Sequence, residues 1–162
     1  KDKGSKTQTP LENGETIALR PTFQQAEMAD SMSKNITHYR PFKGDTVVLK
    51  DLKHGSFFVF RHVDLTGIHS VMMGIGSGDK RYQYAGGRVE IRLDSADGPM
   101  VGQAVVPAFN QKETMVLQEL NINLDAGKFD GNFHDLFFVL RNENKPSELI
   151  GAVDWVRFDL ML

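Results

Sequence analysis

Short runs in which hydrophobic and polar residues alternate recur along this chain. The clearest is RVEIRL at residues 88–93, where Val89, Ile91 and Leu93 alternate with charged residues. A period of two places successive side chains on opposite faces of an extended chain, so this stretch is predicted to be a half-buried β-strand. In VLQELNINL, residues 116–124, the apolar positions also fall on one side.

Other segments are apolar at most positions. SFFVFRHV (56–63) and HDLFFVLR (134–141) are predicted to be central strands covered on both faces. SVMMGIGS (70–77), QAVVP (103–107) and VDWVRFDL (153–160) complete the predicted strands, and Gly- and Asp-containing turns separate them. No ten-residue stretch carries a helical apolar stripe. The pattern predicts an all-β fold, either a sandwich or a jelly roll of antiparallel sheets.

The alternating direction of these strands brings four loops to one edge of the predicted sandwich. They are residues 51–55, 78–87, 108–114 and 142–152, and they are longer and more polar than the turns at the opposite edge. Long loops on a rigid scaffold are the usual location of a binding surface. We therefore expect the functional residues at this edge.

Residues 1–16 differ from the rest of the chain. They are polar and contain Gly, Pro, Ser and Thr, which is typical of a linker or a loosely ordered terminus. The predicted division is therefore a linker at 1–16 and one β-sandwich domain at 17–162. A linker at this position predicts a further domain upstream.

Composition narrows the classes of function. A formal net charge of -2 provides no basic face for nucleic acid, and no apolar run approaches the length of a membrane span. The absence of cysteine excludes disulfides and thiolate metal sites. The five histidines form no metal-binding spacing, and no nucleophile or phosphate-binding motif is present. A non-catalytic domain is expected, with a small hydrolase as an alternative.

Four segments carry a resemblance to a known family. GRVEIRLDSADGPMVGQAVVP (87–107), HDLFFVLRN and VDWVRFDL together resemble family 6 carbohydrate-binding modules, and FQQAEMAD (23–30) is similar to the opening strand of that family. The resemblance implies a jelly-roll β-sandwich of two antiparallel sheets that binds a polysaccharide or oligosaccharide. It also implies attachment to an upstream catalytic domain, carbohydrate-active or sugar-oxidising, in an extracellular or periplasmic protein.

The same resemblance implies a structural calcium ion beside the first and last strands. The candidate ligands are Gln25, Glu27 and Asp159. Gln25 and Glu27 are two residues apart, so on a strand they would share a face, and oxygen ligands of these kinds suit calcium. The alternative is that all three are ordinary solvated residues.

The usual sugar-binding residues of the family are replaced in this chain. Asp51 stands where a Tyr is usual, Lys112 and Met115 where a Trp is usual, and Ala152 where an Asn is usual. Tyr82 and Tyr84 are expected to compensate, because a pyranose packs its apolar face on an aromatic ring.

The candidate sugar site therefore comprises five residues: Asp51, Arg81, Tyr82, Tyr84 and Lys112. Two alternatives stay open. In the first, Tyr82 or Tyr84 covers the rim of the core. In the second, the domain has lost its sugar site and serves as a structural or protein-docking accessory domain. Trp155, on the last strand, is expected to be buried.

Overall fold

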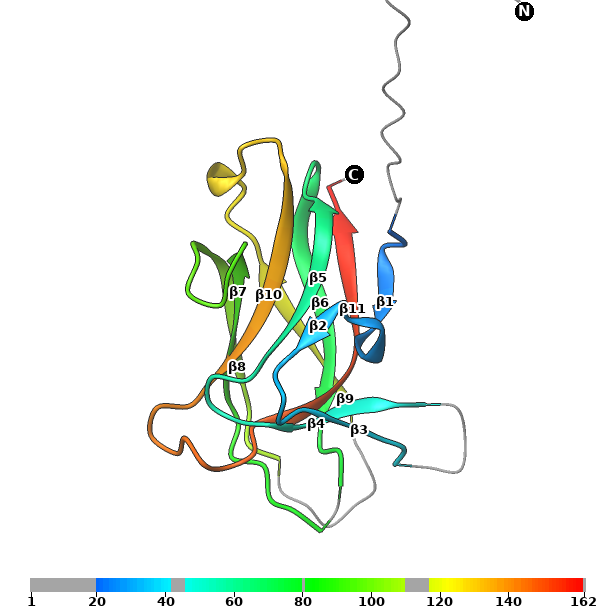
Figure 1. Cartoon of the computed structure of the whole chain (residues 1–162), viewed down its shortest axis with the longest axis vertical. Coiled ribbons are helices and arrows are strands. Elements are labelled where there is room, and N and C mark those ends of the chain that lie inside the picture. The colour runs from blue at the N-terminus through cyan, green and yellow to red at the C-terminus, as the bar shows by residue number, and fades with distance from the viewer. Residues whose placement is uncertain (1–19, 42–45, 80, 110–116, 162) are drawn as a thin grey trace, which may run out of the picture.

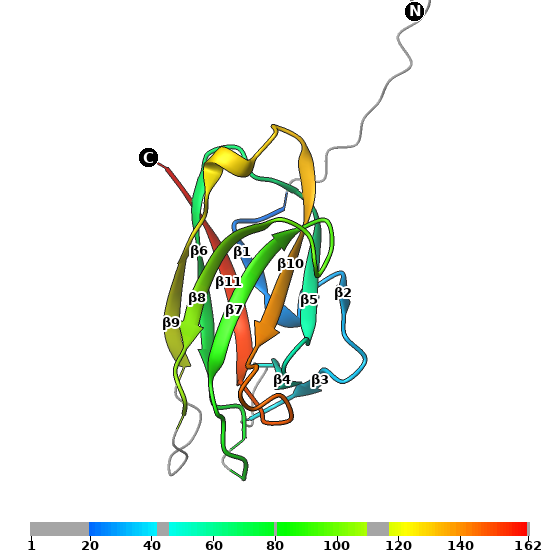
Figure 2. The ribbon, with the colours of Figure 1, turned by 90° about the vertical axis from the view of Figure 1, so that its left-hand side faces the viewer.

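Two antiparallel sheets make up the fold. The computed structural model describes residues 20–41, 46–79, 81–109 and 117–161. Sheet A contains, in spatial order, β3 (Thr37–Tyr39), β4 (Val48–Leu52), β11 (Gly151–Leu160), β6 (Ile68–Gly76) and β9 (Leu117–Asn123), and β1 (Phe23–Gln25) also pairs with β11. Sheet B contains β2 (Ser31–Met32), β5 (Phe57–Asp64), β10 (Phe133–Arg141), β7 (Gly87–Leu93) and β8 (Met100–Val106). The sheets lie face to face, and in Figure 2 β7, β8 and β10 of sheet B lie in front of β6, β9 and β11 of sheet A (compare Figure 1). The predicted all-β, two-sheet sandwich is confirmed.

The core lies between the inner faces of the two sheets. Val89, Ile91 and Leu93 of β7 are buried there, as their alternation predicts. The rings of Phe58 and Phe138 stack with their centroids 4.8 Å apart. Removing these apolar surfaces from water is the main contribution that holds the sheets together.

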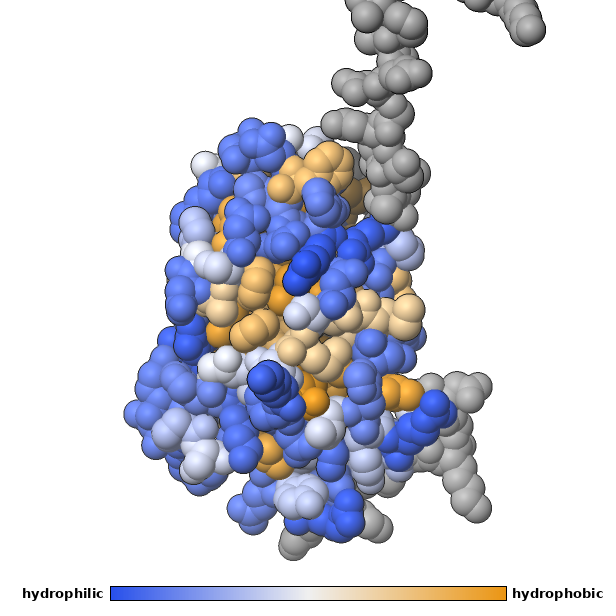
Figure 3. Space-filling model, viewed as in Figure 1, coloured by the Kyte–Doolittle hydropathy of each residue, from blue (hydrophilic) through white to orange (hydrophobic). Residues whose placement is uncertain are grey.

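The outer face of sheet B carries apolar side chains along β5 and β10. Val59 and Val139 are buried on this face, while Phe57 and Phe137 pack at 5.5 Å and stay partly exposed. Figure 3, in the view of Figure 1, shows apolar side chains in the middle of the visible surface. The two strands are therefore buried on one face and only partly shielded on the other, where neighbouring side chains cover one another.

Glu90 projects from the outer face of β7, where a charged side chain is expected to be exposed to solvent. It is only 3% exposed, because Arg88 and Arg92 bind its two carboxylate oxygens at 2.9 and 2.8 Å and Arg141 lies 3.4 Å away. Burial opposes its ionisation, but hydrogen bonds from the arginines outweigh burial and lower the pKa of Glu90. The outer face of β7 is therefore an ion-pair cluster rather than a solvated polar strip.

The described parts of the four loops predicted to share one edge do so, at the lower end in Figure 1, whereas residues 80 and 110–114 of these loops lie outside the described residues. The main chain of Tyr84 bridges to Phe109 and to Leu149, which ties three of the loops together. The fourth is tied in by Asn142, whose N–H donates to Nδ1 of His54 at 3.1 Å. This end of the sandwich therefore holds a set of mutually braced loops.

The segment FQQAEMAD does not form one continuous strand. β1 ends at Gln25, and residues Ala26–Met28 form a 3-10 turn, η1. Three strands, β2, β3 and β4, were not predicted, and a second 3-10 turn, η2, covers Ala126–Lys128. The predicted linker at 1–16 lies outside the described residues. Within the ranges that the structure describes, no helix is long and apolar enough to cross a membrane.

Candidate functional site

A hollow of about 580 Å³ opens among the loops at this end of the sandwich. Its volume falls within the range of typical ligand sites, roughly 300–1,000 Å³. It brings together Asp51 and Tyr82, as predicted from the sequence. The other lining residues were not predicted: Asn35, Lys53, Gln83, Ser147, Glu148 and Leu149.

Tyr82 presents the exposed aromatic ring of this hollow. Its side chain is 45% exposed. Cations surround the ring: Nζ of Lys50 lies 5.6 Å from the ring centroid and the guanidinium of Arg81 lies 5.8 Å away. Lys50 also lies 4.9 Å from the ring of Tyr39. Both cations lie over the ring at cation–π distance and hold it in place, while the Tyr82 side chain stays 45% exposed.

Arg81 is at the surface but is engaged by Asp79. Its Nη2 binds Oδ2 of Asp79 at 2.6 Å, and Asp79 is buried. The hydrogen bond from Arg81 lowers the pKa of Asp79 to about 2, against the opposing effect of burial. Arg81 therefore fixes the loop that carries Tyr82, in addition to placing positive charge beside the hollow.

Tyr84 does not face the hollow. It is 2% exposed, and its hydroxyl oxygen accepts a hydrogen bond from the N–H of Asp79 at 2.9 Å. Burial raises the pKa of this phenol. Of the two readings of Tyr84, the structure supports the one in which the ring covers the rim of the core, so Tyr84 supports the loop and offers no surface to a sugar.

Asp51 and Ala152 occupy positions where the resemblance implies an aromatic residue and an amide. Asp51 has a positive φ of 65°, its carboxylate accepts from the hydroxyl of Thr37, and its carbonyl accepts from Nδ2 of Asn35 at 2.8 Å. Ala152 is fully buried, beneath Gly78, so it cannot touch a ligand. Lys112 and Met115 lie outside the described residues.

A second feature is a pair of buried carboxylates, Glu27 and Asp154. Oε2 of Glu27 and Oδ1 of Asp154 have no hydrogen-bond partner in the part of the chain that is described. Burial first, and then the nearby charge of Glu27, raises the pKa of Asp154. Two buried carboxylates close enough to act on one another's charge fit a hard cation such as calcium, which takes oxygen ligands.

A β-bulge helps to place Asp154. Val153 and Trp155 pair with consecutive residues of β6, Ile75 and Gly74, so Asp154 is the extra residue between them. A bulge bends the strand and redirects a side chain. Here the extra residue is Asp154, whose carboxylate lies near Glu27 of η1.

The predicted ligand set for calcium is therefore only partly brought together. Glu27 lies in η1 and not on β1, so the expectation that it shares a strand face with Gln25 is wrong. Asp159 pairs with Arg157 at 2.8 Å, and the carboxylate beside Glu27 is Asp154. Among the described residues no cluster of three or more acidic or histidine side chains forms a metal site, so main-chain or amide oxygens would have to complete the coordination.

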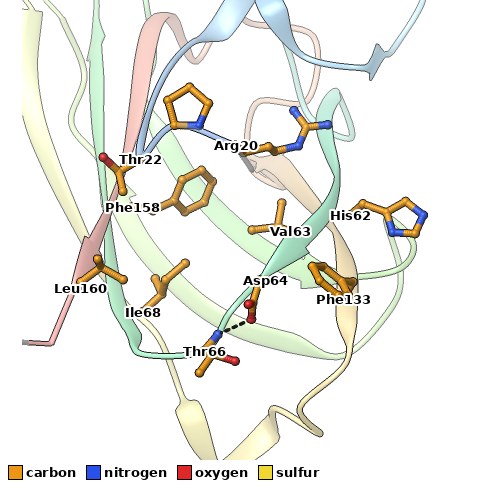
Figure 4. A pocket seen from close by; sticks show the side chains of 11 residues that line it. Arg20, Thr22, His62, Val63, Asp64, Thr66, Ile68, Phe133, Phe158 and Leu160 are labelled. Atoms are coloured by element: carbon orange, nitrogen blue, oxygen red, sulfur yellow. Dashed lines mark hydrogen bonds between the residues drawn. The ribbon is translucent and has the colours of Figure 1, made fainter. Parts of the chain in front are cut away.

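A smaller cavity, of about 210 Å³, lies at the opposite end of the sandwich (Figure 4). Phe158, Ile68 and Val63 line it, and Arg20 and His62 lie at its margin. Arg20 is already engaged, because Nε donates to the carbonyl of Arg61 at 2.8 Å and Nη2 pairs with Asp30. The carboxylate in its lining, Asp64, already accepts a hydrogen bond from the N–H of Thr66 at 2.9 Å, and no amide side chain of the described residues lines this cavity.

Comparison with protein families gives one match. The sequence profile described as "Carbohydrate binding module (family 6)" matches residues 25–159. Comparison with curated protein sequences finds no significant match.

Solved structures with this fold include three informative examples. A β-1,3-glucan-binding family 6 module from Bacillus halodurans is 23% identical, with a TM-score of 0.67 over 84% of this chain and 93% of that one. A family 43 arabinoxylan arabinofuranohydrolase from Bacillus subtilis, solved with cellotetraose, is 20% identical with a TM-score of 0.68; the match covers 87% of this chain but 27% of that enzyme. A family 36 module solved with calcium and xylotriose is 15% identical, with a TM-score of 0.54 over 85% of this chain and 98% of that one.

Proposed function

The chain belongs to carbohydrate binding module family 6, and from that premise we propose that it binds a polysaccharide or oligosaccharide in the loop hollow beside Tyr82. The observation that carries the proposal is an exposed Tyr82 ring next to amide and carboxylate side chains in a hollow of ligand size. The apolar face of a pyranose packs on such a ring, and the polar groups bind its hydroxyls.

The polar groups of the hollow are placed for this role. Nδ2 of Asn35 is bound to the carbonyl of Asp51, so the amide is held in one orientation at the edge of the hollow. Lys53 and Glu148 add a donor and an acceptor to the lining of the hollow. Because charges of both signs line the hollow, a neutral or weakly acidic glycan fits it best.

Binding without catalysis is the activity that we propose. Family 6 domains are non-catalytic modules, typically found in secreted carbohydrate-active proteins. The similar domain in the arabinofuranohydrolase supports the proposal that this chain is likewise joined to a catalytic domain, in an extracellular or periplasmic protein. The glycans bound to the similar structures make β-1,3-glucan, cello-oligosaccharides and xylo-oligosaccharides the first ligands to test.

We also propose that Glu27 and Asp154, with an amide or carbonyl oxygen from the neighbourhood of Gln25, hold a structural calcium ion. The two buried oxygens without partners are the observation in favour. When bound, the ion would neutralise two carboxylates that otherwise repel one another. It would join η1 to β11, at a distance from the sugar, and so act on stability and not on recognition.

Affinity electrophoresis in gels that contain soluble β-1,3-glucan, a cellulose derivative or xylan tests sugar binding. The wild type should be retarded by at least one of these, and Tyr82→Ala should weaken binding about tenfold, which corresponds to roughly 1.4 kcal/mol for the lost stacking surface. Phe133→Ala is the matched control, because Phe133 is 46% exposed but lies at the opposite end. Equal retardation of the Tyr82 and Phe133 variants would contradict the hollow as the site.

A structural or protein-docking role is the second candidate function. It is favoured by Ala152, which is buried where the family usually offers an amide. Under this role none of the polysaccharides would retard the wild type. The open hollow beside Tyr82 weighs against it, because a domain that had lost its ligand would be expected to fill that space.

A further inference from the structure

Asn35 lines the loop hollow from a turn that the core holds in place. The N–H of Ile36 donates to the carbonyl of Ser33 at 3.0 Å, which closes the turn, and the side chain of Ile36 is buried. The N–H of Ser33 donates to the carbonyl of Phe57 at 2.9 Å, which joins the turn to β5. The main chain around Asn35 is therefore fixed, although its side chain is exposed at the hollow.

The side-chain amide of Asn35 uses both of its N–H groups inside the protein. Nδ2 donates to the carbonyl of Asp51 and to Oγ of Ser56, each at 2.8 Å. An asparagine amide has two N–H donors and one carbonyl acceptor, so only Oδ1 remains for a ligand. The reverse orientation of the amide would set Oδ1 against the carbonyl oxygen of Asp51, where neither atom can donate. Asn35 therefore meets a ligand as an acceptor alone.

Ser56 holds this amide from behind the wall of the hollow. Ser56 is only 3% exposed. Its Oγ accepts from the main-chain N–H of Lys53 at 3.0 Å as well as from Asn35, and its carbonyl accepts from the N–H of Leu140 at 2.8 Å, which anchors it to β10. Ser56 therefore acts on a ligand in the hollow only through its neighbours.

Asp51 gives the same wall a second acceptor. Its carboxylate accepts from the hydroxyl of Thr37, and an ionised carboxylate has no proton to donate. A sugar hydroxyl can donate, whereas an ether or ester oxygen can only accept. The wall formed by Asn35 and Asp51 therefore selects a ligand group that donates, and a free sugar hydroxyl is such a group.

We propose that Asn35 is a specificity-determining residue of the loop hollow, which accepts a hydrogen bond from a sugar hydroxyl, and that Ser56 is a positioning residue that holds the Asn35 amide for this contact. The proposal rests on the proposed glycan-binding function of the hollow and adds the direction of one hydrogen bond. An amide that is held before the ligand arrives need not be ordered on binding. The amide that buried Ala152 cannot offer is thereby supplied from the turn between β2 and β3.

Calorimetric titration with cellohexaose, xylohexaose and laminarihexaose tests the contact. Asn35→Ala should weaken binding of whichever of these the wild type binds about tenfold, because it removes the acceptor. Asn121→Ala is the matched control and should bind like the wild type. Asn121 is an exposed asparagine of β9 whose amide likewise binds within the protein, to Asn123 at 3.2 Å.

A double-mutant cycle tests the role of Ser56. Ser56→Ala should weaken binding about threefold in the wild-type background, because the released amide must then be ordered on binding. In the Asn35→Ala background the same substitution should have no further effect on affinity. A purely structural role, through the turn at 53–56, would weaken binding equally in both backgrounds. Ser56→Cys, which keeps a small side chain but offers only a weak acceptor, repeats the comparison.

The direction of the hydrogen bond is tested on the ligand. Deoxyfluoro derivatives of cellobiose, xylobiose or laminaribiose, matched to the oligosaccharide that binds, replace one hydroxyl at a time by a fluorine that cannot donate. One member should bind the wild type about tenfold more weakly than the parent disaccharide and should bind the wild type and Asn35→Ala alike. A series without such a member overturns the acceptor role of Asn35.

Tryptophan emission checks that each variant is folded. Trp155 is the single tryptophan of the chain, and it pairs with Gly74 of β6 in sheet A. Trp155 is partly exposed, so the expectation that it is buried is wrong. Its emission should be the same in the wild type and in all of these variants.

The outcomes separate this proposal from the proposed function. Binding that Tyr82→Ala weakens but Asn35→Ala leaves unchanged overturns the role of Asn35 and leaves the hollow standing. Equal effects of Ser56→Ala in the two backgrounds overturn the positioning role of Ser56, whereas an effect confined to the wild-type background supports it. No binding of any of the three hexasaccharides by the wild type overturns the hollow and this proposal together.

Discussion

Glu27 and Asp154 lie close together, and each has one buried carboxylate oxygen with no hydrogen-bond partner among the described residues. Such a pair is unfavourable without a cation, because burial and mutual repulsion both oppose ionisation. The pKa of Asp154 is raised by folding, so in metal-free protein its contribution favours the fold at low pH and is lost as the pH rises through the folded pKa.

We therefore expect calcium to stabilise the domain at neutral pH. At about 100 times its dissociation constant the ion should add roughly 2.7 kcal/mol, or about 5–10 °C in Tm, measured by thermal denaturation with calcium and with EGTA. Asp154→Asn should abolish the calcium response. Asp159→Asn should retain it, because Asp159 pairs with Arg157, and loss of the response in the Asp159 variant instead would refute this ligand set.

His134 should make stability depend on pH in the same direction as calcium-free Asp154. Its Nδ1 and Nε2 lie 2.9 and 2.8 Å from Asp94 and Asp130. Burial opposes the charged ring, but hydrogen bonds to the two carboxylates outweigh burial and raise the pKa of His134. A raised histidine pKa gives stability that is complete below the unfolded pKa and lost as the pH rises through the folded pKa.

His134→Gln should accordingly cost about 1–2 kcal/mol in the free energy of unfolding at pH 5.5 and less at pH 9. Denaturant unfolding at the two pH values measures the difference. His69→Gln, at an exposed position of β6, is the control and should cost little at either pH. A pH-independent cost of His134→Gln would show that the ring acts by packing alone.

Tyr84→Phe should weaken sugar binding although Tyr84 does not face the hollow. The substitution leaves the N–H of Asp79 without the hydroxyl that accepts its hydrogen bond, at a cost of about 1–3 kcal/mol. Since Asp79 also binds Arg81, the loop carrying Tyr82 should lose definition. Thermal denaturation and calorimetric titration with an oligosaccharide should both change, whereas Tyr82→Phe should leave Tm unaltered; unchanged values for Tyr84→Phe would contradict this bracing role.

Gly74→Ala should displace the indole of Trp155, because the new methyl group would lie 2.5 Å from Nε1. Overpacking of this kind costs about 1–3 kcal/mol. The tryptophan emission should shift to longer wavelength as the ring moves from the sheet into water. Gly127→Ala, where the nearest atom is Oδ1 of Asp125 at 3.3 Å, should leave emission unchanged. An unshifted spectrum in the Gly74 variant would mean that the indole does not rest on this glycine.

The strands that sequence reasoning identified are those long enough to show a pattern. β7 alternates over seven residues, and its inward set is buried as expected. β2 and β3 contain two and three residues, too few for a period of two to be visible, and their pairing with β5 and β4 is what makes them strands. A short strand of this kind is set by its neighbours in space, which the sequence does not contain.

The positions of the site residues also depend on neighbours in space, although one sequence pattern that could have been used, at Asp154, was overlooked. Tyr82 and Tyr84 were treated alike, yet one is exposed and the other is buried and bridged to Phe109 and Leu149, contacts that depend on tertiary structure. Asp154, by contrast, lies two and four residues before the core residues Val156 and Phe158 of β11, so its side chain projects from the same face of the strand. This spacing predicts a carboxylate directed toward the interior, whereas Asp159 alternates with these residues and projects from the opposite face.

Arg20 and Met161, the outermost described residues, both lie at the end of the sandwich opposite the loop hollow, where Met161 is bound to the carbonyl of Gly67. A tether attached through either end of the chain therefore leaves the mouth of the hollow pointing away from the attachment point. In a surface-immobilised array, or in a fusion to a reporter enzyme, the domain would present its hollow outward whichever terminus is used.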